Sequence, residues 1–270
     1  FVEANFTTQL LYAFLGGLIP ALIWLWFWLR EDLHPEPKRL LVKAFAAGAI
    51  AIPFALLAEA LLYCTSAYLF LFSEEAHICG AATPPLRAFM EIADIFVLIA
   101  FAASEEVVKY ISAKRFVLKG KDFDEPVDAM IYLITVALGF AAFENFFFLL
   151  SAFGNTLFEG IVVTNLRFLG ATLLHAVSSG VVGYAVALSF FHAGERAYHA
   201  AFGLLAATGI HVLFNIFVTS ANGEAGFGQA LGILVLTSLF LIFAFDRVKK
   251  IKKAARFQRI VPIQNSAVLL

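Results

Sequence analysis

The chain has 270 residues, of which 61% are hydrophobic and only 14% are charged. Soluble domains are about half apolar and about a quarter charged, so this composition excludes an ordinary soluble domain and indicates a membrane protein. The formal net charge of −1 says little because the charges are segregated along the chain, and two cysteines, Cys64 and Cys79, exclude a disulfide framework or a CxxC zinc site.

Apolar stretches long enough to cross a bilayer occur seven times. A spanning helix needs about 20 mostly apolar residues. In chain order the stretches are residues 6–29, 42–72, 87–112, 127–152, 165–190, 199–220 and 226–246. No internal repeat or long linker separates them. The sequence therefore predicts an all-α bundle of about seven transmembrane helices in one domain, residues 1–246, followed by a tail, residues 247–270.

Basic residues are concentrated on alternate connections. Sixteen lysines and arginines flank the first, third and fifth connections or lie in the tail, against only Arg87 and Arg167 on the opposite side. The positive-inside rule then places the amino terminus outside and the carboxyl terminus in the cytoplasm. The tail mixes basic and apolar residues, which indicates binding to the anionic inner leaflet rather than to nucleic acid. Cys64 and Cys79 fall towards the outer side, where a disulfide and free thiols are both open.

Ten ionisable residues nevertheless lie inside the apolar stretches. Each one near the bilayer centre costs at least about 2.5 kcal/mol unless it faces protein or water, so we expect them to converge in a wet cavity. Glu91 and Asp94 lie near an outer helix end, and Asp128 lies at a helix start, where charged residues are ordinary. Glu59 stands alone on its helix and is open to a packing or a functional role. The others are Glu105, Glu106, Lys109, Glu144, His175 and His211.

Glu105, Glu106 and Lys109 lie on adjoining turns of one predicted helix. Adjacent glutamates point about 100° apart, so one can face a cavity while the other braces it. Lys109 is within reach of either and can neutralise one carboxylate, which leaves the second to titrate separately. Two carboxyl groups in different environments suit general acid–base work on water, whereas a buried salt bridge that only fixes packing needs one glutamate.

Glu144, His175 and His211 lie on three further helices. Two histidines and a glutamate match the protein ligands of a catalytic zinc with an open position. Asn215 follows His211 by one helical turn and could orient a ligand or an oxyanion. By helical rise, Glu144 falls nearer the outer half than the histidines, unless its helix begins below the membrane surface or tilts.

Five motifs carry these residues in a fixed order. They are Glu105-Glu106-x-x-Lys109, Asp128-Ala-Met-Ile-Tyr132, Gly139-Phe-x-x-Phe-Glu144-Asn145, His175-Ala-x-x-x-Gly180 and His211-x-x-x-Asn215. Together they resemble the PrsW family of intramembrane proteases, which is related to the CAAX prenyl proteases and to bacteriocin-processing membrane proteases. The resemblance covers somewhat under half of the chain. Relatives outside the PrsW branch carry a histidine where this chain has Glu144.

The resemblance implies a multi-pass protein of a prokaryotic plasma membrane that hydrolyses a peptide bond of a membrane-anchored substrate, such as a single-span anti-sigma factor. In the metal-dependent version, one glutamate of the pair deprotonates a zinc-bound water. In the metal-free version a glutamate activates water directly, and both versions stay open. Carried over by position, the catalytic and supporting residues are Glu105, Glu106, Lys109 and Asn215, and the candidate zinc ligands are Glu144, His175 and His211.

Three other functions remain as alternatives. A proton-coupled transporter would use the same carboxylates and histidines as a relay, but it predicts an inverted repeat, and none is found. A haem protein would use His175 and His211 as axial ligands and leaves the glutamates unexplained. A seven-helix receptor rests on span count alone.

Overall fold

The computed structural model describes residues 5–70, 92–219 and 224–260, and these ranges contain helices and no strand. The helices are α1 (Phe6–Leu29), α2 (Lys38–Phe70), α3 (Ile92–Phe116), α4 (Pro126–Asn155), α5 (Leu157–Leu169), α6 (Ala171–Leu188), the short 3-10 helix η2 (Ala193–Glu195), α7 (Arg196–Thr219) and α8 (Glu224–Ile260). The predicted all-helical fold is confirmed.

Six stretches of the described chain are long and apolar enough to cross a membrane: Phe6–Leu29, Lys38–Thr65, Pro126–Asn155, Leu157–Leu188, Arg196–Thr219 and Ala225–Ile251. The remaining long helix, α3, has 25 residues, but it carries Glu105, Glu106 and Lys109 among its charged residues. Its charge content keeps it out of this group. The multi-pass architecture is therefore established, while the count of seven spans and the orientation stay predictions.

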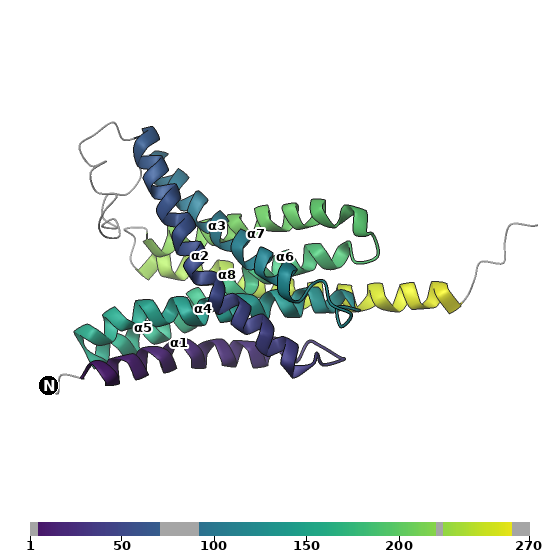
Figure 1. Ribbon diagram of the computed structural model, residues 1–270, viewed down its shortest axis with the longest axis horizontal. Helices are drawn as coiled ribbons and strands as arrows, with labels where there is room; N and C mark the ends of the chain where they lie inside the picture. The colour runs from purple at the N-terminus through teal and green to yellow at the C-terminus, as the bar shows by residue number, and fades with distance from the viewer. Residues whose placement is uncertain (1–4, 71–91, 220–223, 261–270) are drawn as a thin grey trace, which may run out of the picture.

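Helix α4 lies at the centre of the bundle, where it packs against α1, α2 and α6 (Figure 1). Its residues from Pro126 to Ala142 are all buried, which explains why this stretch reads as a continuous apolar run. Helices α2 and α3 lie side by side and cross α1 and α4 obliquely (Figure 1). The centre of the molecule is therefore a helix surrounded by other helices, and polar side chains there can meet from several directions.

Two glycines allow α2 and α4 to cross at very short range. A Cβ atom on Gly139 would lie 1.9 Å from the carbonyl oxygen of Phe45, and one on Gly48 would lie 1.8 Å from that of Val136. Only hydrogen fits at these two positions, because the backbones themselves are in contact. The crossing places Phe140, the next residue of α4, beside the polar centre described below.

The predicted fifth span, residues 165–190, corresponds to the apolar stretch Leu157–Leu188, but that stretch is not one continuous helix. Gly170 has φ −97° and ψ −94°, outside the helical region, and it divides the segment into α5 and α6. Helix α5 begins at Leu157, just after α4 ends, and Trp24 of α1 donates a hydrogen bond of 2.9 Å to the carbonyl of Phe168. Because the break lies at Gly170, α6 begins only four residues before His175.

The predicted last span, residues 226–246, is confirmed by the apolar stretch Ala225–Ile251, but its helix is longer than expected. It was expected to end at residue 246, but α8 continues without a break to Ile260, so the first half of the basic tail belongs to that helix. Binding of the tail to an anionic leaflet stays a prediction. Cys79, Arg87 and Glu91 lie outside the described residues, as does the side chain of Asp94, so the expectations for them are untested.

Candidate active site

Four helices bring the predicted polar residues together. Their contacts join positions that are far apart in the sequence: His175 Nε2 lies 2.6 Å from Glu144 Oε2, and His211 Nδ1 lies 2.9 Å from Glu106 Oε1. By helical rise, Glu144 was expected nearer the outer half of the membrane than the histidines. In the structure it lies on the 30-residue helix α4, which begins at Pro126, and contacts His175 directly. We call Glu105, Glu106, Lys109, Glu144, His175 and His211 the Glu/His network.

Glu106 is the most highly bonded member of the Glu/His network. Its Oε1 accepts hydrogen bonds from Lys109 Nζ at 2.7 Å, Ser178 Oγ at 2.9 Å and His211 Nδ1 at 2.9 Å. Its Oε2 accepts from Ser179 Oγ at 3.4 Å. The side chains of Glu106 and Lys109 are both fully buried. Three donors satisfy Oε1 and Oε2 has one longer contact, so Glu106 fixes the side chains around it.

His175 is held on both sides of its ring. Nε2 faces Glu144, and Nδ1 lies 3.0 Å from Lys109 Nζ. A lysine ammonium group can only donate, so Nδ1 accepts from Lys109 and the ring proton lies on Nε2, which donates to Glu144. The Phe140 ring packs against the imidazole at a centroid distance of 5.4 Å and shields this contact.

His211 has the complementary arrangement. Its Nδ1 donates to the Glu106 carboxylate, so the lone pair of the neutral ring lies on Nε2. Each histidine thus gives one N–H to a carboxylate and keeps one nitrogen with a lone pair. That pattern is the one that orients metal-ligating histidines in proteins.

Glu105 points into the gap between the two histidines. Its Oε2 is buried, has no hydrogen-bond partner in the described parts of the chain, and lies 3.8 Å from His175 Nδ1 and 4.0 Å from His211 Nε2. Burying a carboxylate oxygen is costly unless a proton, a water or a cation completes it. The two glutamates of the pair therefore differ as predicted, one braced and one facing a gap.

Glu105, His175 and His211 could hold a metal ion. One ligand atom from each lies within 4.8 Å of the others, and no second group of this kind occurs among the described residues. Zinc binds these atoms at about 2.0–2.2 Å, which places tetrahedral ligands roughly 3.4 Å apart. The observed separations of 3.8 and 4.0 Å need only small side-chain shifts. Glu144, predicted as a ligand, instead contacts the opposite nitrogen of His175.

Arg167 extends the Glu/His network beyond Glu144. Its Nη2 lies 3.1 Å from Glu144 Oε1, and its Nε donates to Asn145 Oδ1. Asn145 in turn donates from Nδ2 to Thr172 Oγ1 at 2.9 Å, which links α4, α5 and α6. From the sequence, Arg167 was expected only as a charge on the outer side. Its position within an apolar stretch, eight residues before His175, was the signal that it needs a carboxylate partner.

Two predicted residues have weaker links to this centre. The half-buried Asn215 side chain makes no hydrogen bond within the described ranges, although its backbone carbonyl accepts one from Thr219. Glu59 is half-buried on α2 and within electrostatic range of Glu105 and Glu144. Glu59 is thus not isolated from the other carboxylates, as its solitary position on the helix had suggested.

A second acidic cluster surrounds the start of α4. Asp128 accepts hydrogen bonds from the backbone N–H groups of Asp124 and Glu125 at 2.9 and 2.7 Å, which is the helix-start role expected for it. Tyr132 donates to Glu36 in the connection between α1 and α2. Burial is the main cause that raises the pKa of Glu36 above its ordinary value. The hydrogen bond between Tyr132 and Glu36 thus joins the connection between α1 and α2 to α4.

The histidine geometry excludes the haem alternative in this conformation. The ring centroids of His175 and His211 are 5.3 Å apart, and the rings meet edge to face at 82°. Rings in direct contact leave no room for a macrocycle between them.

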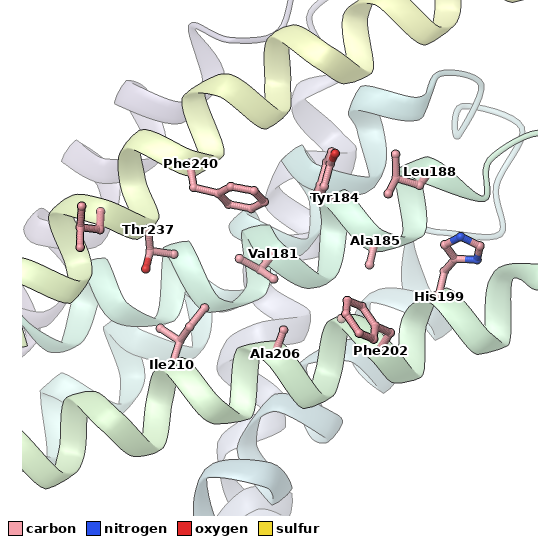
Figure 2. A pocket seen from close by; sticks show the side chains of 12 residues that line it. Val181, Tyr184, Ala185, Leu188, His199, Phe202, Ala206, Ile210, Thr237 and Phe240 are labelled. Carbon is pink, nitrogen blue, oxygen red and sulfur yellow. The ribbon is translucent and has the colours of Figure 1, made fainter.

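An apolar groove with a volume of about 410 Å³ lies between α6, α7 and α8 (Figure 2). Its walls include Val181, Phe202 and Phe240, whose side chains point into it (Figure 2). No member of the Glu/His network lines the groove, although Ile210 at its edge directly precedes His211. The groove is therefore a neighbouring surface and not the site of the polar chemistry.

Comparisons with known proteins agree with this picture. The sequence model of a family described as "PrsW family intramembrane metalloprotease" matches residues 36–245. The chain is 24% identical to "Protease PrsW" of Geobacillus kaustophilus over 259 residues, which cover 93% of this chain and 97% of the relative. It is 22% identical to "Protease PrsW" of Oceanobacillus iheyensis over 239 residues, which cover 88% and 94%. No solved structure matches the chain.

Proposed function

The chain belongs to the PrsW family of intramembrane proteases, and on that premise we propose that Glu105, His175 and His211 form its reactive centre. Membership makes it a membrane-embedded protease of a bacterial cell membrane, in agreement with its multi-pass structure. The observation that carries the proposal is the buried Glu105 Oε2, unpartnered within the described residues and placed between the two histidine lone pairs.

Glu105 is the carboxylate that is free to react. The other two carboxylates of the Glu/His network are engaged, Glu106 by four donors and Glu144 by His175 and Arg167. In a metal-free site, Glu105 would take a proton from the attacking water and return it to the leaving amine. Peptide hydrolysis is then balanced, since water supplies both the hydroxyl of the new acid and the proton of the new amine.

The same three side chains would hold the metal ion that the family's description implies. Such an ion supplies Lewis-acid activation of water and of the scissile carbonyl. In this arrangement Glu144 and Glu106 orient His175 and His211 through their ring N–H groups. Glu105 thus takes the ligand position that the sequence prediction gave to Glu144, and Glu144 orients His175 instead.

We propose a single-span membrane protein as the substrate. Two of the three residues of the reactive centre, His175 and His211, lie in membrane-spanning stretches, so a peptide bond must be presented at the level of those helices. A substrate anchored in the same bilayer reaches such a site by lateral diffusion. The proton-coupled transporter is not favoured, because both curated relatives named above are proteases.

The direct test is cleavage of a single-span substrate by the purified protein in lipid vesicles. We expect wild-type protein to cut the substrate, and His175→Ala and His211→Ala each to abolish cutting while the helical content is kept. Cutting that persists in both variants would show that the reactive centre is misplaced.

Metal content decides between the two roles of Glu105. If the metal-held arrangement is correct, purified active protein contains one divalent ion, and a strong chelator abolishes cutting that added zinc restores. Full activity in metal-depleted protein would favour direct activation of water by Glu105.

A further inference from the structure

Lys109 is the member of the Glu/His network whose role the proposed reaction leaves unexplained. It is completely buried on α3, which packs against the spanning helices α2, α4 and α7, and an ammonium group there needs strong partners. Its Nζ lies 2.7 Å from Glu106 Oε1 and 3.0 Å from His175 Nδ1, and 5.2 Å from the centre of the Phe140 ring. Neutralising Glu106 requires only the first of these contacts.

The second contact involves the nitrogen that a metal ion would use. His175 Nε2 is occupied by Glu144, so Nδ1 carries the lone pair, and Nδ1 is also the nitrogen that faces Glu105 Oε2 at 3.8 Å. One lone pair cannot accept a hydrogen bond from Lys109 and bind a metal ion at the same time. Of the three donors, only Glu105 Oε2 and His211 Nε2 are free of such a competitor.

We propose that Lys109 is a built-in competitor for the metal: its ammonium group occupies His175 Nδ1 in the metal-free protein and must leave that nitrogen when a divalent ion binds to Glu105, His175 and His211. The inference rests on the proposed reactive centre. Lys109 thereby keeps the site ordered and partly neutralised without metal, and it lowers the affinity of the site for metal.

The size of the effect follows from the contact that must be broken. A hydrogen bond from a charged donor changes an equilibrium constant by roughly 10- to 100-fold. Removing the ammonium group should therefore tighten zinc binding by roughly that factor, and it also removes a positive charge beside the incoming ion. Substitution of a lysine that contacts no residue of the Glu/His network should give no gain in affinity.

The test is the zinc affinity of purified protein, measured by competition with a chromophoric chelator and independent of proteolysis. The variants are Lys109→Gln, whose amide can still donate to Glu106, and Lys109→Met, which removes all donors. The matched control is Lys114→Gln, since Lys114 lies on the same helix but is exposed. His211→Ala identifies the zinc that is bound at the proposed centre.

We expect one zinc per wild-type chain that is lost in His211→Ala, an affinity roughly 10- to 100-fold tighter in Lys109→Gln, and no change in Lys114→Gln. Lys109→Met should behave like Lys109→Gln, and thermal unfolding checks that both variants are folded. Equal or weaker zinc binding by the folded Lys109→Gln variant would overturn the inference and leave the reactive centre intact. Zinc binding that His211→Ala does not affect, in wild type and variant alike, would instead contradict the proposed metal centre.

Discussion

Glu105 and Glu106 are neighbours in sequence but have opposite environments. Glu106 is surrounded by donors and pairs with the buried Lys109, whereas the Oε2 of Glu105 has no partner within the described chain. The difference arises because α6 brings two serines, Ser178 and Ser179, against one carboxylate only. The orientation of the two side chains on α3 thus decides which glutamate is fully hydrogen-bonded and which has an unpartnered oxygen within the described chain.

Removing the charge of each glutamate should therefore have unequal effects on stability. Glu106→Gln leaves the Lys109 ammonium group buried without its carboxylate, and we expect a loss of about 3–5 kcal/mol in the free energy of unfolding. Glu105→Gln replaces an unpartnered carboxylate by a neutral amide, so it should unfold at the wild-type temperature or above it. Thermal unfolding in detergent micelles measures both, and equal losses in the two variants would contradict the assigned environments.

At the scale of helices, the α2–α4 crossing places Phe140 of α4 against His175 of the Glu/His network. Gly139→Ala would place a methyl group 1.9 Å from the Phe45 carbonyl oxygen, and backbone cannot give way as a side chain can. We expect a loss of at least about 1–3 kcal/mol in stability together with reduced cleavage. Gly154→Ala is the matched control on the same helix, because a Cβ atom there meets nothing within 4 Å. Equal unfolding temperatures for the two variants would show that the crossing tolerates separation.

The first connection is joined to α4 through Glu36, whose pKa is raised by burial. A carboxyl group with a raised folded-state pKa favours the folded state below its unfolded value, near 4.5, and that contribution is lost as pH rises through the folded value. The unfolding temperature of wild type should therefore fall between pH 5 and pH 8 by more than that of Glu36→Gln. The exposed Glu195→Gln is the control and should follow wild type. Parallel pH profiles for wild type and Glu36→Gln would exclude this linkage.

At the scale of the whole molecule, the charge distribution predicts which ends face the cytoplasm. Single cysteines at the exposed positions His34 and Gly194 should be protected from a membrane-impermeant maleimide in intact cells, in a background without the native cysteines. A cysteine at the exposed Thr156, at the α4–α5 turn, should be labelled. The reverse pattern would invert the predicted topology.

Much of this architecture could be predicted from the sequence. Long apolar stretches predict the spanning helices, and the cost of burying charge predicts that the ionisable side chains meet one another inside the bundle. The break at Gly170 could not be predicted, since a single glycine in an apolar run is compatible with a continuous helix. Nor could the different positions of Glu105 and Glu144, which face opposite nitrogens of His175. Arg167 was missed because its partner lies 23 residues earlier on another helix.

The central claim is that Glu105 reacts while Glu144 orients His175. Cleavage of one single-span substrate by Glu105→Gln and Glu144→Gln, in identical vesicles and at equal protein amounts, tests it most directly. We predict no detectable cutting by Glu105→Gln and a residual rate, reduced by roughly 10- to 100-fold, for Glu144→Gln. Substantial cutting by Glu105→Gln, with none by a folded Glu144→Gln, would contradict the claim.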